Sequence, residues 1–386
     1  MLRVAFLTST DPLDRGSWSG TPYHMFRALE SRGCEVTAIG PLRTPVRNWL
    51  RVYGKLRGAV RPGKYIHGHS AVFARSCARA AGARMAGRTF DAAVAPAASA
   101  VIAYLKTDVP IVYVSDATFA LLEGYYPDFS DLCAASSRDG HALEALAIAN
   151  AAAVSYPSAW AARSAERDYG APGGKLHVMP FGVNFENVPG REEVLSRPRS
   201  ERIELLLVGK QWERKGGDTA VETLLELERM GVDAALTVCG CAPPPGTRHP
   251  RLRVVPFLDK NDPHERAELV RLYSTADVLI LPTRSECLGM VVAEANAFGL
   301  PAFVSATGGL PEVVRDGVNG YALPVEARGG EYARLLRDVW SGGERIRALS
   351  EASRNEYETR LNWDSWAGSM CGLFSELSDA RSLRPS

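Results

Sequence analysis

Long apolar runs are absent from this sequence. No hydrophobic stretch reaches the roughly 20 residues that a membrane-spanning helix requires. The N-terminus, MLRVAFLTST, lacks a signal-peptide pattern and is instead typical of a first buried strand. We therefore expect a protein that stays in the cytoplasm.

Paired cysteines and metal motifs are also missing. The seven cysteines are an odd number without paired spacing, which indicates core residues in a reducing compartment rather than a disulfide framework. Cys239-Gly240-Cys241 and His67-Gly68-His69 each lack a second ligand pair at a known spacing. We expect no bound metal.

The chain as a whole has almost no excess of charge of either sign. A net charge of +1 gives no global bias toward nucleic acid, and 46% hydrophobic residues are typical of a globular protein. Its 386 residues favour two domains rather than one. No Gly-x-Gly-x-x-Gly follows the first strand, which makes a dinucleotide-dependent dehydrogenase the least favoured enzyme class.

Short apolar runs alternate with helical patterns, as in parallel sheets joined by crossover helices. The expected strands are LRVAFLT, EVTAIG, DAAVAP, PIVYVS and AAVSYPS in the first half, and IELLLVG, DAALTVCG, LRVVPF, ADVLILP and LPAFVS in the second. The clearest helices are 22–32, 138–149, 158–168, 217–230, 264–274 and 290–298. Between the halves, FENVPGREEVLSRPRSER is polar and twice interrupted by proline, which predicts an exposed linker.

Two carboxylates stand eight residues apart in SECLGMVVAEANAFG. Glu286 is expected in a loop and Glu294 one turn inside the helix that follows. Gly289, Met290 and Val291 would then present backbone N–H groups at the helix N-terminus, where a diphosphate is favoured. This layout suits a bound nucleotide sugar.

A cationic loop follows the strand IELLLVG. Lys210 and Lys215 stand five residues apart, ahead of a helix that opens after Gly216-Gly217. A strand end that leads into such a loop suits phosphate binding, although a solvated charged turn has the same composition.

These segments, with flanks ADVLILPTRSE and AFGLPAFVSATGGLPEVVRDGVNGYALP, resemble the retaining glycosyltransferases of family 4, whose E-x7-E motif this is. The resemblance covers nearly the whole chain and is strongest at 201–325. It implies an α/β protein of GT-B fold, with two Rossmann-like domains of parallel sheet facing across a cleft. Residues 1–185 would form an acceptor-binding domain, 186–200 a linker, 201–360 a nucleotide-sugar-binding domain, and 361–386 a helix crossing back to the first domain.

The resemblance also implies roles for residues of the second domain. Glu286 would orient the sugar hydroxyls and Glu294 the ribose, and Leu288 stands where an aromatic residue is common. Phe257 and Leu258 correspond to the segment that meets the nucleobase, but core positions would suit them equally. Lys210 and Lys215 match an arginine and a lysine that neutralise the departing diphosphate, and Arg214 could supply the fork that Lys210 lacks.

The implied reaction moves a sugar from a nucleoside-diphosphate sugar, UDP favoured over GDP, to an acceptor hydroxyl with retention of configuration. The leaving diphosphate would take the acceptor proton on the same face of the sugar, without a covalent intermediate. The sequence contains no Asp-x-Asp motif, which agrees with metal independence in this fold, and no cofactor is expected.

Three residues of the first domain are further candidates. Gly20 permits close backbone approach, and Thr21 is the expected N-cap of the first helix. The family's glycine-rich loop faces the donor here, but a plain capped helix would look the same. Asp116 follows the strand PIVYVS, where it either contacts sugar or acceptor hydroxyls or caps the next turn.

Acidic residues are missing between Glu35 and Asp91, although basic ones are frequent in 43–88. Six apolar residues there share one predicted helical face: Val46, Trp49, Leu50, Tyr53, Leu56 and Val60. Such a helix either meets anionic lipid at the inner membrane face, as in family members that act on lipid-linked acceptors, or packs on its own domain with its basic residues toward water or an acidic acceptor. No nucleic-acid motif accompanies the charge.

Two other functions stay open at this point. A nucleotide-sugar epimerase shares the GT-B plan, and a non-catalytic sugar-binding subunit would keep the same binding residues. An epimerase would change a nucleotide sugar without an acceptor, whereas a silent subunit would release no nucleoside diphosphate.

Overall fold

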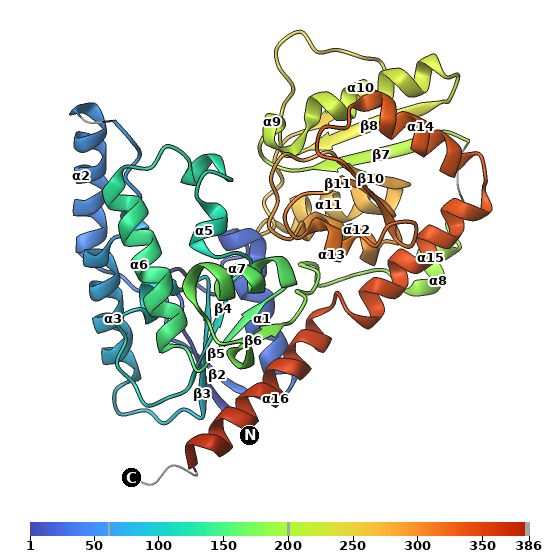
Figure 1. Ribbon diagram of the computed structural model, residues 1–386. Coiled ribbons are helices and arrows are strands. Elements are labelled where there is room, and N and C mark those ends of the chain that lie inside the picture. The colour runs from blue at the N-terminus through green and yellow to red at the C-terminus, as the bar shows by residue number, and fades with distance from the viewer. Residues whose placement is uncertain (61, 199–200, 383–386) are drawn as a thin grey trace. The chain divides into compact units, whose positions relative to one another are not determined.

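The computed structural model describes residues 1–60, 62–198 and 201–382, which form two α/β units (Figure 1). Unit 1 comprises Met1–Pro180 with Trp363–Ser386, and unit 2 comprises Phe181–Asn362. Parts of three expected segments lie outside the described residues: Arg61 of the basic segment, positions 199–200 of the linker and positions 383–386 of the last helix.

Unit 1 contains a six-stranded sheet in the order β2-β1-β3-β4-β5-β6, with every pairing parallel. The strands are β1 Arg3–Phe6, β2 Glu35–Ala38, β3 Ala92–Pro96, β4 Ile111–Val114, β5 Ala153–Tyr156 and β6 Leu176–Val178. Strands β3, β4 and β5 are buried along their whole length, which explains why they are apolar without alternation.

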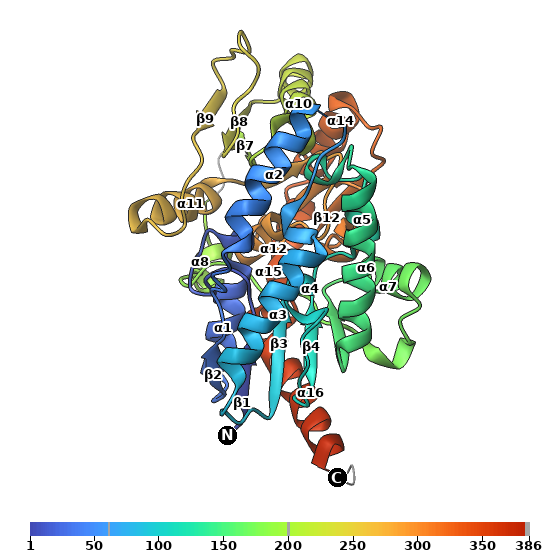
Figure 2. The same ribbon diagram turned by 90° about the vertical axis from the view of Figure 1, so that its left-hand side faces the viewer.

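Helices cover both faces of this sheet (Figures 1 and 2). They are α1 Thr21–Ser31, α2 Val46–Val60, α3 Ala71–Met85, α4 Ser99–Ile102, α5 Phe119–Leu122, α6 Ala134–Asn150, α7 Ala159–Tyr169 and α16 Trp363–Ser382. Short 3₁₀ helices lie at Ser17–Gly20, His67–His69, Pro127–Phe129 and Gly173–Lys175.

The C-terminal helix α16 packs against α1 and β3 of unit 1. Its apolar residues are buried, with Trp366 2% exposed and Met370 and Phe374 fully covered. Arg32, just after α1, also binds the carboxylate of Asp364 at 2.6 Å. Helix α16 therefore completes the unit that the N-terminal half begins.

Unit 2 has a second six-stranded parallel sheet, in the order β12-β11-β10-β7-β8-β9. Its strands are β7 Ile203–Val208, β8 Ala234–Cys239, β9 Leu252–Val255, β10 Val278–Leu281, β11 Ala302–Ser305 and β12 Gly320–Leu323. Its helices are α8 Arg191–Leu195, α9 Trp212–Lys215, α10 Gly217–Arg229, α11 Pro263–Thr275, α12 Met290–Ala297, α13 Leu310–Val313, α14 Gly329–Trp340 and α15 Glu344–Thr359.

The two sheets confirm the predicted fold class and all ten expected strands. Strands β6 and β12 are not among these ten, and β12 was not predicted as a separate strand. It begins at Gly320, where a Cβ would lie 2.0 Å from the carbonyl oxygen of Ala302 on β11. Only glycine allows β12 to approach β11 this closely.

The expected linker, 186–200, carries its own secondary structure as far as it is described. Helix α8 packs against α15, and Arg191 pairs with Glu351 at 3.2 Å and Glu358 at 2.7 Å. Residues 186–198 thus lie within unit 2. The chain passes between the units at Pro180–Phe181 and at Asn362–Trp363.

Candidate functional site

The carboxyl ends of β7 and β10 form the centre of the candidate site in unit 2. These strands are neighbours although β8 and β9 lie between them in the sequence, so their loops diverge at a topological switch point. Ligands of open parallel sheets bind at such points. The loop after β10 carries Glu286, and the loop after β7 leads into α9 and Lys215.

Helix α12 begins where the sequence predicted. Gly289 is its N-cap in the left-handed conformation, with φ 80°, and Met290 is the first helical residue. A Cβ on Gly289 would lie 2.4 Å from the Leu310 side chain, so glycine is required both for the backbone turn and for packing. Leu288, the residue before this N-cap, is buried at 3% exposure.

Glu286 is held by two cations. Lys215 donates from Nζ to Oε2 of Glu286, and Arg214 Nη1 lies 3.6 Å from the same oxygen. All three side chains are largely buried, with 7% of Lys215, 12% of Glu286 and 14% of Arg214 exposed. A charge of this kind is tolerated out of water only when it is paired.

Glycines around Lys215 leave the space that its side chain occupies. A Cβ on Gly209, at the end of β7, would lie 2.6–2.9 Å from three carbons of the Lys215 side chain. Gly216 closes α9 with φ 75°, and a Cβ there would lie 1.9 Å from the Pro282 carbonyl oxygen. The glycine-rich sequence therefore brings Lys215 against the β10 loop.

Glu294 lies on α12 with both carboxylate oxygens occupied. Lys260 Nζ is 2.6 Å from Oε1, and Tyr273 donates its hydroxyl to Oε2 at 2.9 Å. Glu294 is 2% exposed and Tyr273 is fully buried. Burial and the neighbouring carboxylate raise the pKa of Tyr273 well above its ordinary value, so its hydroxyl remains a donor.

Sequence reasoning missed Lys260, although a signal was present. Residues 181–362 contain three lysines, Lys210, Lys215 and Lys260, among many arginines. All three follow the carboxyl ends of β7 or β9, and two of them bind the two glutamates of the E-x7-E motif.

Lys210 does not join Lys215 at Glu286 among the ion pairs of the described residues. Its Nζ lies 4.0 Å from the ring centre of Phe257. Phe257 is 50% exposed, so it is not a core residue, which was one of the two positions that the sequence left open. Leu258 is half-buried. Arg214, the residue that could supply the fork that Lys210 lacks, is the second cation beside Glu286.

Unit 1 brings its own candidates together at the carboxyl ends of β1 and β4. Trp18 donates from Nε1 to Asp116 Oδ2 at 3.3 Å. Gly20 has φ 90°, and it, not Thr21, is the N-cap of α1. The predicted threonine cap is therefore wrong: the chain enters the helix through a left-handed glycine, and the buried Thr21 is already helical.

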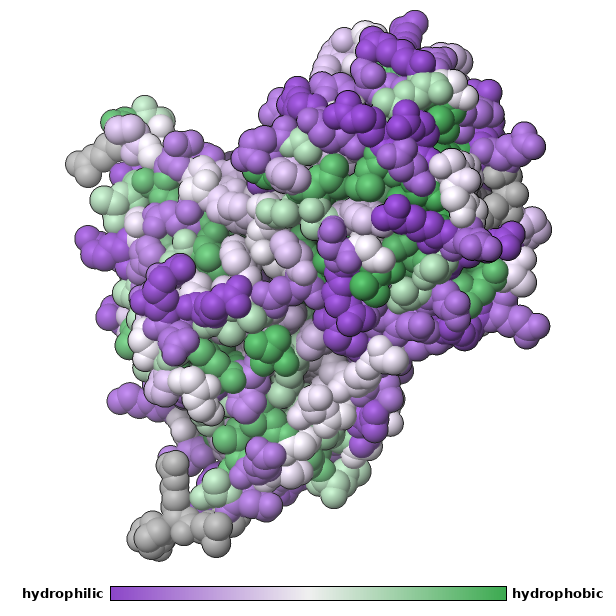
Figure 3. All heavy atoms as spheres, turned by 45° about the vertical axis from the view of Figure 1, so that its right-hand side comes forward, coloured by the Kyte–Doolittle hydropathy of each residue, from purple (hydrophilic) through white to green (hydrophobic). Residues whose placement is uncertain are grey.

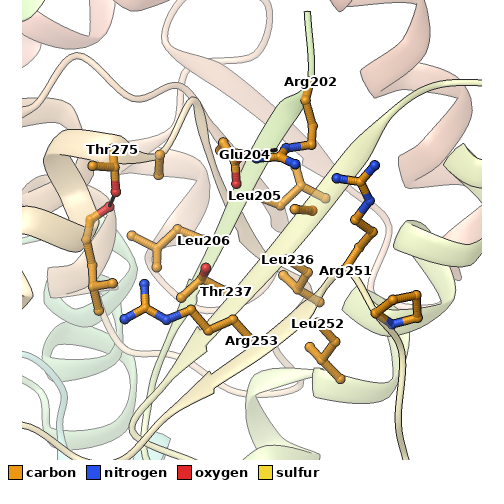
Figure 4. Close-up of a pocket in the computed structure, with 14 residues that line it drawn as sticks. Arg202, Glu204, Leu205, Leu206, Leu236, Thr237, Arg251, Leu252, Arg253 and Thr275 are labelled. Atoms are coloured by element: carbon orange, nitrogen blue, oxygen red, sulfur yellow. Dashed lines mark hydrogen bonds and ion pairs between the residues drawn. The ribbon is translucent and has the colours of Figure 1, made fainter. Parts of the chain in front are cut away.

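A pocket of about 400 Å³ lies at the opposite, amino ends of β7–β9 (Figure 4). Three arginines line it, and each is paired with a carboxylate: Arg202 with Glu204 at 2.7 Å, Arg251 with Asp233 at 3.2 Å and Arg253 with Glu268 at 3.1 Å. The pocket is separate from the site at the carboxyl ends.

Comparison with known families agrees with the geometry of the site. Residues 195–356 match the model of glycosyl transferases group 1, and residues 21–187 match that of Glycosyltransferase Family 4. The chain belongs to glycosyltransferase family 4. The members of this family are glycosyltransferases.

Curated relatives of this glycosyltransferase include two D-inositol 3-phosphate glycosyltransferases. The Xylanimonas cellulosilytica protein is 30% identical over 56% of this chain and 55% of its own length. The Corynebacterium aurimucosum protein is 26% identical over 72% of this chain and 68% of its own length. The chain thus spans little more than half the length of the first of these relatives.

Solved structures share the fold over nearly the whole glycosyltransferase. Sucrose-phosphate synthase from Thermosynechococcus elongatus has a TM-score of 0.70 at 18% identity, covering 98% of this chain and 100% of that one. Anabaena HepE in complex with UDP-glucose has a TM-score of 0.64 at 13% identity, covering 97% and 100%. These neighbours confirm the GT-B fold that the sequence predicted.

Proposed function

We propose that this glycosyltransferase transfers a sugar from a nucleoside-diphosphate sugar to an acceptor hydroxyl with retention of configuration. The supporting observation is the convergence of Lys215, Arg214, Glu286 and the glycine-initiated helix α12 at one strand end. Two fixed cations and a helix N-terminus suit a diphosphate. The UDP-glucose complex of a structural neighbour favours UDP over GDP.

The proposed roles of the cationic residues follow from the negative charge that the leaving diphosphate gains. As the bond from the anomeric carbon to the diphosphate oxygen breaks, negative charge grows on the diphosphate. Lys215, Arg214 and the N–H groups of Gly289, Met290 and Val291 stabilise this charge, and Lys210 adds a more exposed cation. These groups supply the positive charge, so the reaction proceeds without a divalent ion or a cofactor.

The same diphosphate oxygen accepts the acceptor's proton while the acceptor oxygen bonds the anomeric carbon on the same face. Retention follows because the nucleophile enters from the side that the diphosphate leaves. Glu286 orients the sugar hydroxyls beside Leu288, and Glu294 binds the ribose. Phe257 and Leu258 lie in the segment that we assign to the base.

Unit 1 receives the acceptor in this proposal. Asp116 accepts a hydrogen bond from an acceptor hydroxyl, and the backbone at Gly20 and Thr21 allows close approach of a ligand. The relatives named D-inositol 3-phosphate glycosyltransferase make inositol phosphate a first acceptor to test, alongside lipid-linked saccharides.

The test is release of nucleoside diphosphate from UDP-glucose and GDP-mannose with each acceptor, in buffer containing EDTA. Transfer with an unchanged anomeric configuration, read by NMR of the product, supports the proposal. Epimerisation of the donor without acceptor would instead establish an epimerase, and the absence of turnover with every pair would favour a silent subunit.

We also propose that the enzyme works at the inner face of a membrane, where α2 contacts anionic lipid. Four residues of its expected apolar face are exposed, Trp49 at 63%, Tyr53 at 44%, Leu56 at 67% and Val60 at 80%, and Val52 beside them is exposed at 57%. Apolar residues gather at the tip of α2 (Figure 3).

The predicted face of α2 is therefore divided in two. Leu50 is 2% exposed and Val46 packs on the core of unit 1, whereas the other four face outward. Tyr53 also contacts Tyr65 edge-on, with 5.3 Å between the ring centres, so the inner part of α2 packs on the domain while the exposed apolar residues support lipid contact. Arg47, Arg51 and Lys55 form an exposed basic row next to the outward face, as in interfacial helices.

No helix in the described part of the chain is long and apolar enough to cross a bilayer. Contact would be peripheral, and vesicle co-sedimentation tests it. We expect binding to phosphatidylglycerol vesicles, weak binding to phosphatidylcholine, and loss of binding in Trp49→Ser/Leu56→Ser. Val178→Ser, which removes an apolar side chain 49% exposed on β6, is the matched control. Equal binding of all variants would refute the contact.

A further inference from the structure

The two glutamates of the E-x7-E motif each bind a different lysine. Lys215 binds Glu286 from the loop after β7, and Lys260 binds Glu294 from the loop after β9. Residues 181–362 contain three lysines, Lys210, Lys215 and Lys260, and their other basic residues are arginines and histidines. The lysines are therefore concentrated in the loops after β7 and β9. Lys260 has no part in the function proposed above.

The surroundings of Glu294 fix its side chain. Lys260 binds one oxygen and Tyr273 the other, so the carboxylate is held from both sides. The rings of Phe185, Tyr273 and Phe298 pack together with centroid separations of 5.4–5.6 Å. Lys260 Nζ also lies 5.0 Å from the ring centre of Phe185.

The main chain at Lys260 is equally constrained. Arg266 donates from Nη1 to the Lys260 carbonyl oxygen at 2.5 Å, and Asp262 caps α11 by accepting from the N–H groups of His264 and Glu265. With 15% of its side chain exposed, Lys260 lies at the border between solvent and the buried carboxylate.

This arrangement leaves Glu294 able to accept further hydrogen bonds. An ionised carboxylate offers about four lone-pair positions, and the two partners use one on each oxygen. A ribose hydroxyl can donate to one of the remaining positions, and it gains most from a carboxylate that its partners already hold in place.

We propose that Lys260 is a positioning residue that holds the carboxylate of Glu294 in the orientation that binds the ribose hydroxyls of the donor. The inference rests on the proposed function, in which Glu294 binds the ribose. It adds that recognition of the ribose depends on a lysine 34 positions before the glutamate in the sequence.

The experiment compares Lys260→Met with wild type by calorimetry. The probes are UDP and its 2′,3′-dideoxy analogue, with GDP and ADP in parallel. We expect Lys260→Met to weaken UDP binding about 10-fold while dideoxy-UDP changes less than about 2-fold. Donor KM should rise with kcat nearly unchanged, because the ribose contact is the same in ground and transition states.

Three further variants separate positioning from folding. Lys260→Arg keeps the charge and should recover most of the UDP affinity, and Tyr273→Phe should give a smaller loss that is also specific for ribose. Arg253→Met is the matched control. It removes a cation that pairs with Glu268 at the amino ends of the strands, away from the site, and should leave the affinities for UDP and dideoxy-UDP unchanged.

Equal weakening of UDP and dideoxy-UDP in Lys260→Met would overturn the inference in favour of a structural role, and no weakening of either would overturn it directly. If wild type binds neither UDP, GDP nor ADP, the proposed donor function fails first. That result is distinct, because it appears before any variant is compared.

Discussion

Lys215 and Glu286 form a buried ion pair, although 71 residues separate them in the sequence. Gly209 makes room for the lysine and Gly216 lets its helix end against the β10 loop. The pair thus depends on two glycine positions of the backbone as well as on its own charges.

Gly209→Ala should lower kcat about 10-fold or more while the melting temperature stays near that of wild type. The added methyl group would collide with the flexible Lys215 side chain rather than with backbone, so the fold can accommodate it by displacing the lysine. Steady-state kinetics and a thermal melt check this. Gly330→Ala, where a Cβ meets nothing closer than 3.6 Å, should change neither quantity.

Lys215→Met and Glu286→Gln should each reduce kcat by about 100- to 1,000-fold, because the first removes charge stabilisation and the second the orientation of the sugar. Arg214 remains near Glu286 at 3.6 Å in Lys215→Met, so this variant should still fold. Nucleoside-diphosphate release gives the rates. Undiminished turnover in both variants would reject the assigned roles.

Glu144→Gln should alter the pH dependence of stability. Burial raises the pKa of Glu144 from 4.5 to about 8, with Tyr113 bonded to its carboxyl at 3.2–3.3 Å. The raised pKa means that the folded form holds a proton that the unfolded form loses above about pH 4.5. This contribution to stability is complete below that pH and is lost as the pH rises through about 8.

The loss amounts to at most roughly 5 kcal/mol, since each pKa unit corresponds to about 1.4 kcal/mol. Wild type should therefore lose melting temperature between pH 5 and pH 8.5, and Glu144→Gln should lose less over the same range. Parallel curves for the two proteins would show that Glu144 is not the group responsible.

Trp366→Ala should destabilise unit 1 by about 3–5 kcal/mol, because α16 buries this indole almost completely. Trp49→Ala removes an equally large side chain from the exposed face of α2 and should change stability by less than about 0.5 kcal/mol. Denaturant unfolding of both variants distinguishes a structural α16 from a loosely attached one.

Much of the fold could be predicted from the sequence because the strands are short, apolar and bounded by turn residues. The break at Gly289 was also predictable, since a loop glycine between two carboxylates required a helix start there. Strand β12 was missed because it begins with a glycine, a residue that normally weakens a strand.

Other features depend on tertiary contacts that no local pattern contains. Lys260 reaches Glu294 only because the β9 loop and α12 meet in space. The periodicity of the sequence predicted the apolar face of α2. It could not show that the domain covers Leu50 and leaves Leu56 exposed. The N-cap of α1 was assigned to Thr21 because threonine is a common cap, whereas the left-handed turn required Gly20.

The central claim is that fixed cations and the start of α12 hold the diphosphate in unit 2. A crystal structure of the enzyme with UDP, grown in EDTA, tests it most directly. We predict diphosphate oxygens within about 3 Å of Lys215 Nζ and the backbone N–H at Gly289 or Met290, with the ribose on Glu294. A diphosphate bound elsewhere, for example in the arginine-lined pocket around Arg251, would contradict the claim.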